Sequence, residues 1–280
     1  MNRMQSVSII SNPITEDIRS KGHQSIRFLP DGFSLLVADA SYKPVHLEEF
    51  IAGPDTTPGD LALECIRVLK EKELLGFEGE TVIVLNHPAI TLVPHPFFEE
   101  VRAAAFLRKA APLPPGDAVQ SHPLKDRDLV LVHGVSQGIL DLEEQIGKEP
   151  RLIHASACLV SLADQVQASD HQRGMVLAEV QRNSLDILVI REDKVLLLNR
   201  YPLQEASECI YHILNTMKQL GFDRESIPLY LSGILHPDHE YFGLMKKYIR
   251  HVRMTPYYLE GLSKTQLMQH MILSEGSKSA

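Results

Sequence analysis

The sequence lacks a hydrophobic run long enough to cross a bilayer, since no apolar stretch approaches the roughly 20 residues that a membrane-spanning helix needs. Residues 1–24 also lack the apolar core of a secretory signal. We therefore expect a protein without a membrane span that is located in the cytoplasm.

Cysteine is scarce, with three in 280 residues. Cys65 and Cys209 fall on the apolar faces of predicted helices, and Cys158 lies in the apolar stretch of residues 155–166. Few cysteines in such surroundings favour buried thiols over disulfides. No base stands near any of them in the sequence, which argues against a nucleophilic role.

Clusters of positive charge are also missing. The net charge is -8, and the 28 lysines and arginines are scattered singly or in pairs. Binding to nucleic-acid phosphates needs clustered basic residues, so a general nucleic-acid-binding function is excluded. With 44% hydrophobic and 23% charged residues, the chain has enough apolar residues for about two globular domains.

The second half of the sequence predicts a unit of six elements. Apolar runs separated by short polar breaks predict an antiparallel meander, and apolar residues at spacings of three and four predict helices. In chain order the elements are strands at 175–180, 184–190 and 194–199, a helix at 205–220, a strand at 228–235 and a helix at 240–250. Asp238 is predicted to cap the last helix.

The first half predicts the same unit. Its elements are strands at 25–29, 33–38 and 45–51, a helix at 60–75, a strand at 81–85 and a helix at 97–107. The tripeptide Glu-Cys-Ile occurs at 64–66 and 208–210, and Leu-Gly-Phe occurs at 75–77 and 220–222. Two matches at nearly the same offset, inside the same order of elements, indicate an internal duplication.

The remaining segments set the predicted domain boundaries. Residues 110–128 are rich in proline and predict a surface loop. Further predicted elements are strands at 129–135 and 151–154 and helices at 138–146, 155–168 and 267–273, with residues 274–280 frayed. The predicted division is an N-terminal extension (1–24), lobe 1 (25–128), a joining segment of strand and crossover helices (129–174), lobe 2 (175–255) and a C-terminal tail (256–280).

This order of elements resembles the actin-like ATPase fold, a duplicated ribonuclease H-like α/β fold found in actin, sugar kinases and the bacterial proteins FtsA and PilM. The resemblance covers about residues 25–253. Residues 25–38 and 229–252 are also similar to an uncharacterised bacterial domain-of-unknown-function family that is assigned to this fold.

The resemblance implies where nucleotide would bind. Members of the superfamily carry two Asp-x-Gly phosphate loops, in which the carboxylate organises Mg²⁺ and the glycine lets phosphate approach backbone amides. The matching residues here are Arg27-Phe28-Leu29 and Glu179-Val180-Gln181, so both glycines and the first acid are missing. Asp31-Gly32 reads as a hairpin turn, and the paired glycines of the adenosine motif are reduced to Gly233.

Two functions follow from the resemblance. The favoured one is a non-catalytic pseudo-ATPase without a cofactor, a scaffold or regulator that binds a protein partner or peptide. The alternative is a divergent Mg-ATP-binding ATPase or kinase, in which Glu179, Ser184 and Gly233 contribute to the nucleotide site. The missing phosphate-loop glycines favour the first. The oligomeric state, including a homodimer, stays open.

Metal-dependent chemistry is not expected. His87, His95, His236 and His239 follow equivalent strands and could converge, but His-Pro pairs also end strands, and the spacing of a zinc site is missing. Glu179 and Asp186 suggest a ribonuclease H-type nuclease, yet that chemistry needs several carboxylates around two metals. In the first meander the acids Asp31 and Asp39 are placed for turns. A nucleophile elbow and a Walker loop are absent.

Overall fold

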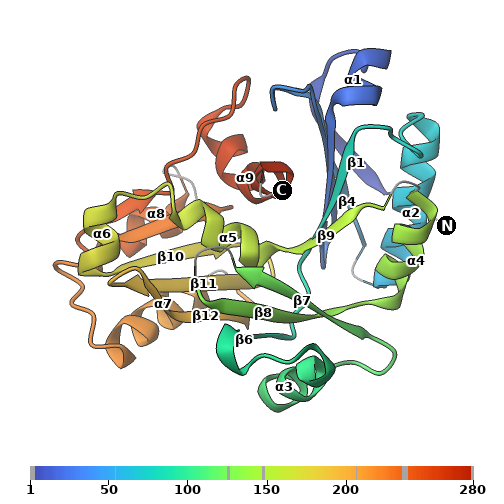
Figure 1. Cartoon of the computed structure of the whole chain (residues 1–280). Helices are drawn as coiled ribbons and strands as arrows, with labels where there is room; N and C mark the ends of the chain where they lie inside the picture. The colour runs from blue at the N-terminus through green and yellow to red at the C-terminus, as the bar shows by residue number, and fades with distance from the viewer. Residues whose placement is uncertain are drawn as a thin grey trace.

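The computed structural model describes residues 4–53, 55–124, 127–146, 149–205, 207–234 and 239–278. These residues form two lobes, each built on one β-sheet, and a smaller insert with a third sheet (Figure 1). No helix among the described residues is long and apolar enough to cross a membrane.

Lobe 1 contains a six-stranded sheet with the order β1-β4-β3-β2-β5-β9. Strands β2, β3 and β4 form an antiparallel meander, whereas β5 and β9 run parallel to β2. The bounds are β1 (Gln5–Ser11), β2 (His23–Leu29), β3 (Gly32–Ala38), β4 (Pro44–Ile51), β5 (Glu80–Leu85) and β9 (Arg151–His154). Helices α2 (Pro58–Glu71) and α4 (Gln137–Ile146) pack against each other and share an apolar core with this sheet. A short helix, α1 (Glu16–Lys21), precedes β2.

Lobe 2 repeats this arrangement with a five-stranded sheet in the order β12-β11-β10-β13-β14. Strands β10, β11 and β12 form the meander, and β13 and β14 are parallel to β10. The bounds are β10 (Met175–Val180), β11 (Ser184–Arg191), β12 (Lys194–Pro202), β13 (Leu229–Gly233) and β14 (Val252–Met254). The helices before and within this lobe are α5 (Ala155–Ala163), α6 (Ala168–Arg173), α7 (Glu208–Gln219) and α8 (Glu240–Met245).

The two sheets have the same topology, as predicted. Without the edge strand β1, the order and the directions of the strands agree between the lobes. Leu29 faces Gly32 across the turn of the first hairpin, and the Gln181 N–H donates to the Ser184 carbonyl across the turn of the second. Arg27 and Glu179 each lie two residues before these turns. They therefore occupy equivalent positions in the two lobes.

The start of α2, the helix that follows the first meander, is set by a local capping motif. Helix α2 starts with a capping box, in which the Thr57 hydroxyl accepts from the Asp60 N–H and the Asp60 carboxylate accepts from the Thr57 N–H. Cys65 on α2 and Cys209 on α7 are buried free thiols, and so is Cys158 on α5. This confirms the prediction that the cysteines are packing residues.

The insert corrects the predicted loop at residues 110–128. Its sheet has the order β6-β8-β7, formed by β6 (Ile90–Pro94), β7 (Ala118–Leu124) and β8 (Leu129–Val135). The loop prediction is wrong for β7, which accommodates Pro123 because it is an edge strand, where one missing N–H costs no ladder bond. The helix predicted at 97–107 is shifted: two 3₁₀ turns, η1 (His95–Phe97) and η2 (Glu100–Arg102), precede α3 (Ala103–Ala110).

Other boundaries differ from the predicted division. The N-terminal extension contains β1, which pairs with β4 in the sheet of lobe 1. Of the strands in the predicted joining segment (129–174), β8 belongs to the sheet of the insert and β9 to the sheet of lobe 1. The helix predicted at 155–168 ends at Ala163, and a separate helix, α6, begins at Ala168. Helix α8, predicted to reach residue 250, ends at Met245. Asp238, the predicted cap of α8, lies outside the described residues.

The C-terminal tail is the largest correction. Helix α9 (Lys264–Lys278) is far longer than the predicted helix at 267–273, and Ser274 and Glu275 are buried, so the predicted fraying from residue 274 is wrong through Lys278. Figure 1 shows α9 between the sheets of the two lobes. It contacts β2 and β5 of lobe 1, β13 of lobe 2, and α5.

Candidate functional site

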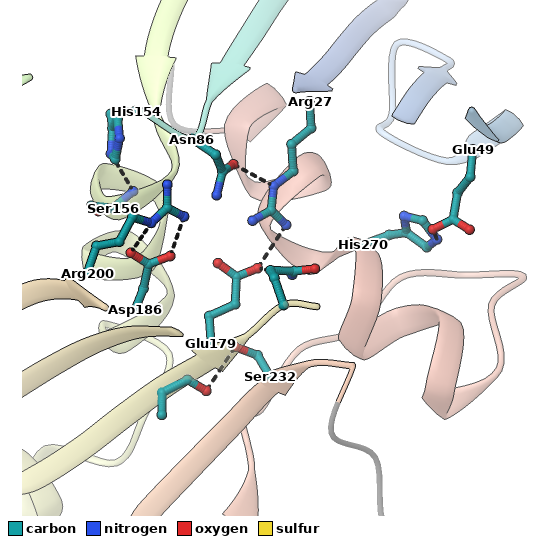
Figure 2. Close-up of polar contacts among 12 residues, drawn as sticks. Arg27, Glu49, Asn86, His154, Ser156, Glu179, Asp186, Arg200, Ser232 and His270 are labelled. Carbon is teal, nitrogen blue, oxygen red and sulfur yellow. Dashed lines mark hydrogen bonds and ion pairs between the residues drawn. The ribbon is translucent and has the colours of Figure 1, made fainter. Parts of the chain in front are cut away.

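The ends of the two equivalent hairpin strands meet between the lobes through a buried ion pair. Arg27 on β2 and Glu179 on β10 point toward each other (Figure 2), with 2.8 Å between Nη1 and Oε1 and side chains that are 2% and 1% exposed. The Arg27 Nε–H donates to the Asn86 side-chain carbonyl at 3.1 Å, and the Gln181 side-chain amide donates to Glu179 at 2.9 Å. Each charge thus neutralises the other where the resemblance places phosphate and Mg²⁺.

A second ion pair joins the turns of the same hairpins. Arg182 lies in the turn after β10 and Asp31 in the turn after β2, with 3.3 Å between Nε of Arg182 and Oδ2 of Asp31. Each hairpin therefore provides one arginine and one acid, and each of these side chains forms an ion pair with a residue of the other hairpin. This arrangement draws the lobes together without a nucleotide between them.

Helix α9 occupies the neighbouring space on the inner face of lobe 1. The Ser25 hydroxyl donates to the Leu273 carbonyl at 2.8 Å, and Leu273 packs with Leu36 and Leu47. Gly276 approaches β5 so closely that an added Cβ would lie 2.5 Å from Cγ2 of Val84. Helix α9 therefore packs closely against the sheet of lobe 1.

His270 of α9 lies beside Glu49 of β4, with 3.3 Å between Nε2 and Oε1. Burial and, to a smaller extent, the nearby Arg27 guanidinium together lower the pKa of His270 to about 4. Burial also raises the pKa of Glu49. His270 is therefore a neutral imidazole at pH 7 inside the interface between α9 and lobe 1.

The described residues at this site lack features that the resemblance requires for holding Mg-ATP. A cavity of about 120 Å³ remains beside Arg27, Gln181 and His270, which is well below the roughly 300 to 1,000 Å³ of ordinary ligand pockets. The Glu179 carboxylate has Arg27 as its counterion, and the Gln181 side chain lies where the resemblance requires glycine. Among the described residues no group of three or more His, Cys, Asp or Glu is placed to hold a metal ion.

The candidate residues Glu179, Ser184 and Gly233 lie on three adjacent strands. Ser184 begins β11 and is buried, and its hydroxyl has no hydrogen-bond partner among the described residues. Gly233 ends β13 with a φ of 84°, and an added Cβ would lie 2.0 Å from the Val180 carbonyl oxygen. Close approach of the backbone therefore requires this glycine without any nucleotide.

The carboxylates that suggested a nuclease are neutralised separately. Asp186 on β11 lies opposite Glu179 on β10 in the strand register. The carboxylate of Asp186 forms an ion pair with Arg200, with 2.6 Å between Oδ2 and Nη2. Burial raises the pKa of Asp186, and the Arg200 guanidinium opposes this rise. The two acids thus have two different arginine partners (Figure 2).

Of the four histidines considered as metal ligands, His87 has hydrogen-bond partners at both ring nitrogens. His87 accepts from the Ala89 N–H at Nδ1, so its Nε2 donates to Asp117 at 2.9 Å. His95 is exposed in the insert. His236 lies outside the described residues, and His239 precedes α8 in lobe 2.

Sequence reasoning identified the positions of Arg27 and Glu179 but missed that they bind each other. The sequence contained a sign of this ion pair, because residues of opposite charge occupy equivalent positions in the two halves of a duplicated fold. The contribution of α9 was also missed.

The fold and this site define an actin-like protein whose hairpin ends are bridged by side chains. The chain belongs to the family described as "Protein of unknown function (DUF3822)", whose profile matches residues 12–252. No curated protein matched the sequence.

Solved structures share the fold at low sequence identity. A Bacteroides thetaiotaomicron protein with an actin-like ATPase fold and unknown function has a TM-score of 0.75 and 22% identity, covering 86% of this chain and 94% of its own. A chain of the PilM–PilN type IV pilus biogenesis complex has a TM-score of 0.59 and 14% identity, with 93% and 98% covered. The ethanolamine utilization protein EutJ from Carboxydothermus hydrogenoformans has a TM-score of 0.50 and 12% identity, with 96% and 91% covered.

Proposed function

We propose that this chain is a non-catalytic actin-like protein that acts in the cytoplasm as a scaffold or regulator and binds a protein partner or peptide. The observation that carries the proposal is the buried Arg27–Glu179 pair at the equivalent ends of β2 and β10. In this fold those ends are where a nucleotide's phosphates and metal would have to be held.

The energetics of the pair support this reading. To bind Mg-ATP, Glu179 would have to exchange Arg27 for a hydrated metal, and a buried arginine would lose its counterion. Separating a buried pair costs about 3 to 5 kcal/mol, which a nucleotide would have to supply before any net binding. The complex of PilM with PilN, an actin-like neighbour, supports partner binding as a use of this fold.

Titration calorimetry with Mg-ATP, run beside a phosphate-release assay, tests the proposal. We expect no saturable binding at millimolar nucleotide and no phosphate release above the buffer rate. An active sugar kinase in the same assays shows that both would detect a functional site.

A dissociation constant in the low micromolar range or better, equivalent to about -8 kcal/mol, would contradict the proposal. Together with phosphate release, it would establish the divergent Mg-ATP-binding ATPase or kinase in its place. Light scattering after size exclusion measures the oligomeric state separately and decides whether the chain is a homodimer.

A further inference from the structure

A second cavity lies away from the hairpin site, between lobe 1 and the insert. Its volume is about 610 Å³, within the range of ordinary ligand pockets. Leu29 and Leu85, at the carboxyl ends of the neighbouring parallel strands β2 and β5, both line it. In open α/β sheets this end of the strands is the usual place for ligands.

The walls of this cavity are mostly apolar. Phe28, Leu61 and Ile139 are core side chains of lobe 1 and its helices, and they line the cavity. Prolines from four separate segments line it as well: Pro30, Pro58, Pro88 and Pro114. Because proline fixes the backbone φ angle, these parts of the wall lose little conformational entropy when a ligand enters. We therefore expect a ligand with an apolar body.

The strands that border the cavity have no free edge. Strand β2 lies between β3 and β5, β5 lies between β2 and β9, and β8 lies between β6 and β7. Their backbone groups are used within the sheets, so an extended peptide cannot add a strand to any of them. This favours a compact small molecule over a peptide as the ligand.

Asp117 carries the only full charge among the described residues that line the cavity. Its Oδ2 accepts from Nε2 of His87 at 2.9 Å. The Nδ1 of His87 accepts from the Ala89 N–H, so the ring has its single proton at Nε2 and is neutral. Asp117 forms no ion pair with a lysine or arginine of the described residues. The carboxylate therefore keeps its negative charge at an apolar wall.

This carboxylate is both held in place and accessible. The Asp117 side chain is 15% exposed. Its Oδ1 has no hydrogen-bond partner among the described residues and is not buried. The ring of His87, which holds Oδ2, packs closely on Gly134, where an added Cβ would lie 2.2 Å from it. Oδ1 is thus available to accept a hydrogen bond from a cationic N–H group.

A single carboxylate suits an organic ammonium group rather than a metal ion. Divalent cations need several oxygen ligands, and no group of three or more His, Cys, Asp or Glu in the described parts of the chain is placed to hold one. Ser136 also lines the cavity, and α4 starts at the next residue. The start of a helix repels a cation, so the ammonium group is expected at Asp117 and not there.

We propose that this cavity binds a small organic amine with an apolar body, whose ammonium group donates to Oδ1 of Asp117. The body lies among Leu61, Ile139 and the prolines. Apolar walls provide the affinity of such a pocket, and the carboxylate selects for positive charge. The inference goes beyond the proposed function, because it adds a small-molecule ligand to a protein that is proposed to bind a polypeptide.

Asp117→Asn removes the charge with little change of structure, because the asparagine carbonyl can still accept from Nε2 of His87. Glu80→Gln is the matched control. Glu80 also has a histidine partner, with 3.1 Å between its Oε2 and Nδ1 of His23, but it is not among the described residues that line the cavity. Each variant removes one negative charge, and both should keep the unfolding midpoint of the wild type.

The probes are two amines, each with its alcohol and its acid: tryptamine with tryptophol and indoleacetate, and octylamine with octanol and octanoate. Calorimetry at pH 7 should show about tenfold tighter binding of each amine than of its alcohol, because unlike charges attract strongly where water is largely excluded. The acids should bind most weakly. Asp117→Asn should bind amine and alcohol equally, with the alcohol unchanged, whereas Glu80→Gln should keep the preference.

Methyl NMR of the wild type locates the site without any variant. Tryptamine should shift the methyl resonances of Leu61 and Ile139. The resonances of Leu214, which lines a separate cavity beside α7, should stay in place.

Four results would overturn the inference. They are no saturable binding of either amine at millimolar concentration, a preference for amines that survives in Asp117→Asn or is lost in Glu80→Gln, shifts at Leu214 instead of Leu61 and Ile139, or displacement of tryptamine at lower concentration by a Gly-Ser decapeptide with one central lysine. The last would identify a polypeptide ligand. Tight Mg-ATP binding would contradict the proposed function and leave these results unchanged, so the two failures are distinguishable.

Discussion

At the scale of single residues, the Arg27–Glu179 pair has a cost as well as a benefit. Removing both charges from water is expensive, and the attraction between them repays this only when the geometry is good. Among the described residues Arg27 Nη2 and Glu179 Oε2 have no hydrogen-bond partner, so the hydrogen-bonding capacity of the pair is only partly used. The pair therefore specifies how the lobes meet more than it stabilises the chain.

This view predicts a non-additive double-mutant cycle. Arg27→Met and Glu179→Met should each lower the free energy of unfolding by about 3 to 5 kcal/mol, because each leaves one buried charge unpaired. The double variant should lose less than either single variant. Urea denaturation measures all three. Lys21→Met, in the exposed Lys21–Asp17 pair, should leave the stability nearly unchanged, because solvent screens that pair. Additive losses would show that the two charges act independently.

His270 predicts a loss of stability in mild acid. Its pKa is about 4 in the folded protein and about 6.5 when unfolded, so below pH 6.5 the unfolded chain binds the extra proton. Its contribution is fully present above pH 6.5 and is lost as the pH falls toward 4. Between pH 7 and pH 5 the loss is about 2 kcal/mol.

Urea denaturation of the wild type and of His270→Gln at both pH values isolates this contribution. His133, His154 and the carboxylates that do not contact His270 titrate in both proteins, so their effects cancel in the comparison, whereas Glu49, 3.3 Å from His270, belongs to the contribution that is measured. The glutamine variant should lose about 2 kcal/mol less between pH 7 and pH 5. An identical pH dependence would mean that His270 is accessible to protons in the folded protein.

At the scale of elements, two helical glycines predict opposite results for the same substitution. Gly276 of α9 has no room for a Cβ beside Val84, whereas Gly243 of α8 has nothing within 4 Å. Gly276→Ala should destabilise the protein by about 1 to 3 kcal/mol through overpacking. Gly243→Ala should be neutral or stabilise it by up to about 1 kcal/mol, because alanine is the better helix former. Thermal unfolding measures both.

Val84→Ala provides the check on this mechanism. It removes the methyl group that Gly276→Ala would contact, so the double variant should recover part of the loss from Gly276→Ala. If Gly276→Ala is as harmless as Gly243→Ala, the close packing of α9 against β5 would be disproved.

Most of the elements could be predicted from the sequence, and the exceptions have physical causes. The strands of both meanders are apolar runs bounded by turns, a local signal. Strand β7 has no such signal, because Gln120, Ser121 and His122 are half-buried at a sheet edge. Helix α9 buries polar side chains such as His270 and Ser274 as well as apolar ones. Its apolar periodicity is therefore weak, and its true length could not be predicted.

The candidate site could be predicted only in part for a related reason. The register of each hairpin is local, so the equivalence of Arg27 and Glu179 could be inferred from the sequence. Whether the two side chains touch depends on the angle between the lobes, which α9 and the Asp31–Arg182 pair help to set. Contacts between lobes leave no local pattern in the sequence.

At the scale of the whole molecule, the apolar cluster of lobe 2 extends onto β5 of lobe 1 and onto α9, while the core that lobe 1 forms with α2 and α4 is separate. Met268, Met271 and Ile272 of α9 belong to the large apolar cluster that contains the sheet of lobe 2, while Leu273 packs on lobe 1. That cluster also contains Val82 and Val84 of β5. Unfolding of either lobe alone would expose the faces of α9 and the charges of the Arg27–Glu179 pair.

We therefore expect the chain to unfold in one cooperative transition. At about 0.7 kcal/mol per residue, unfolding all 280 residues requires about 200 kcal/mol near 60 °C, and one lobe alone about half of this. Scanning calorimetry should give a van 't Hoff enthalpy equal to the calorimetric enthalpy. A variant without residues 256–280 should unfold at a lower temperature in two resolved transitions, because α9 no longer couples the lobes. Two transitions in the full-length chain would instead show that the lobes are independent, and α9 would then be an appendage of one lobe.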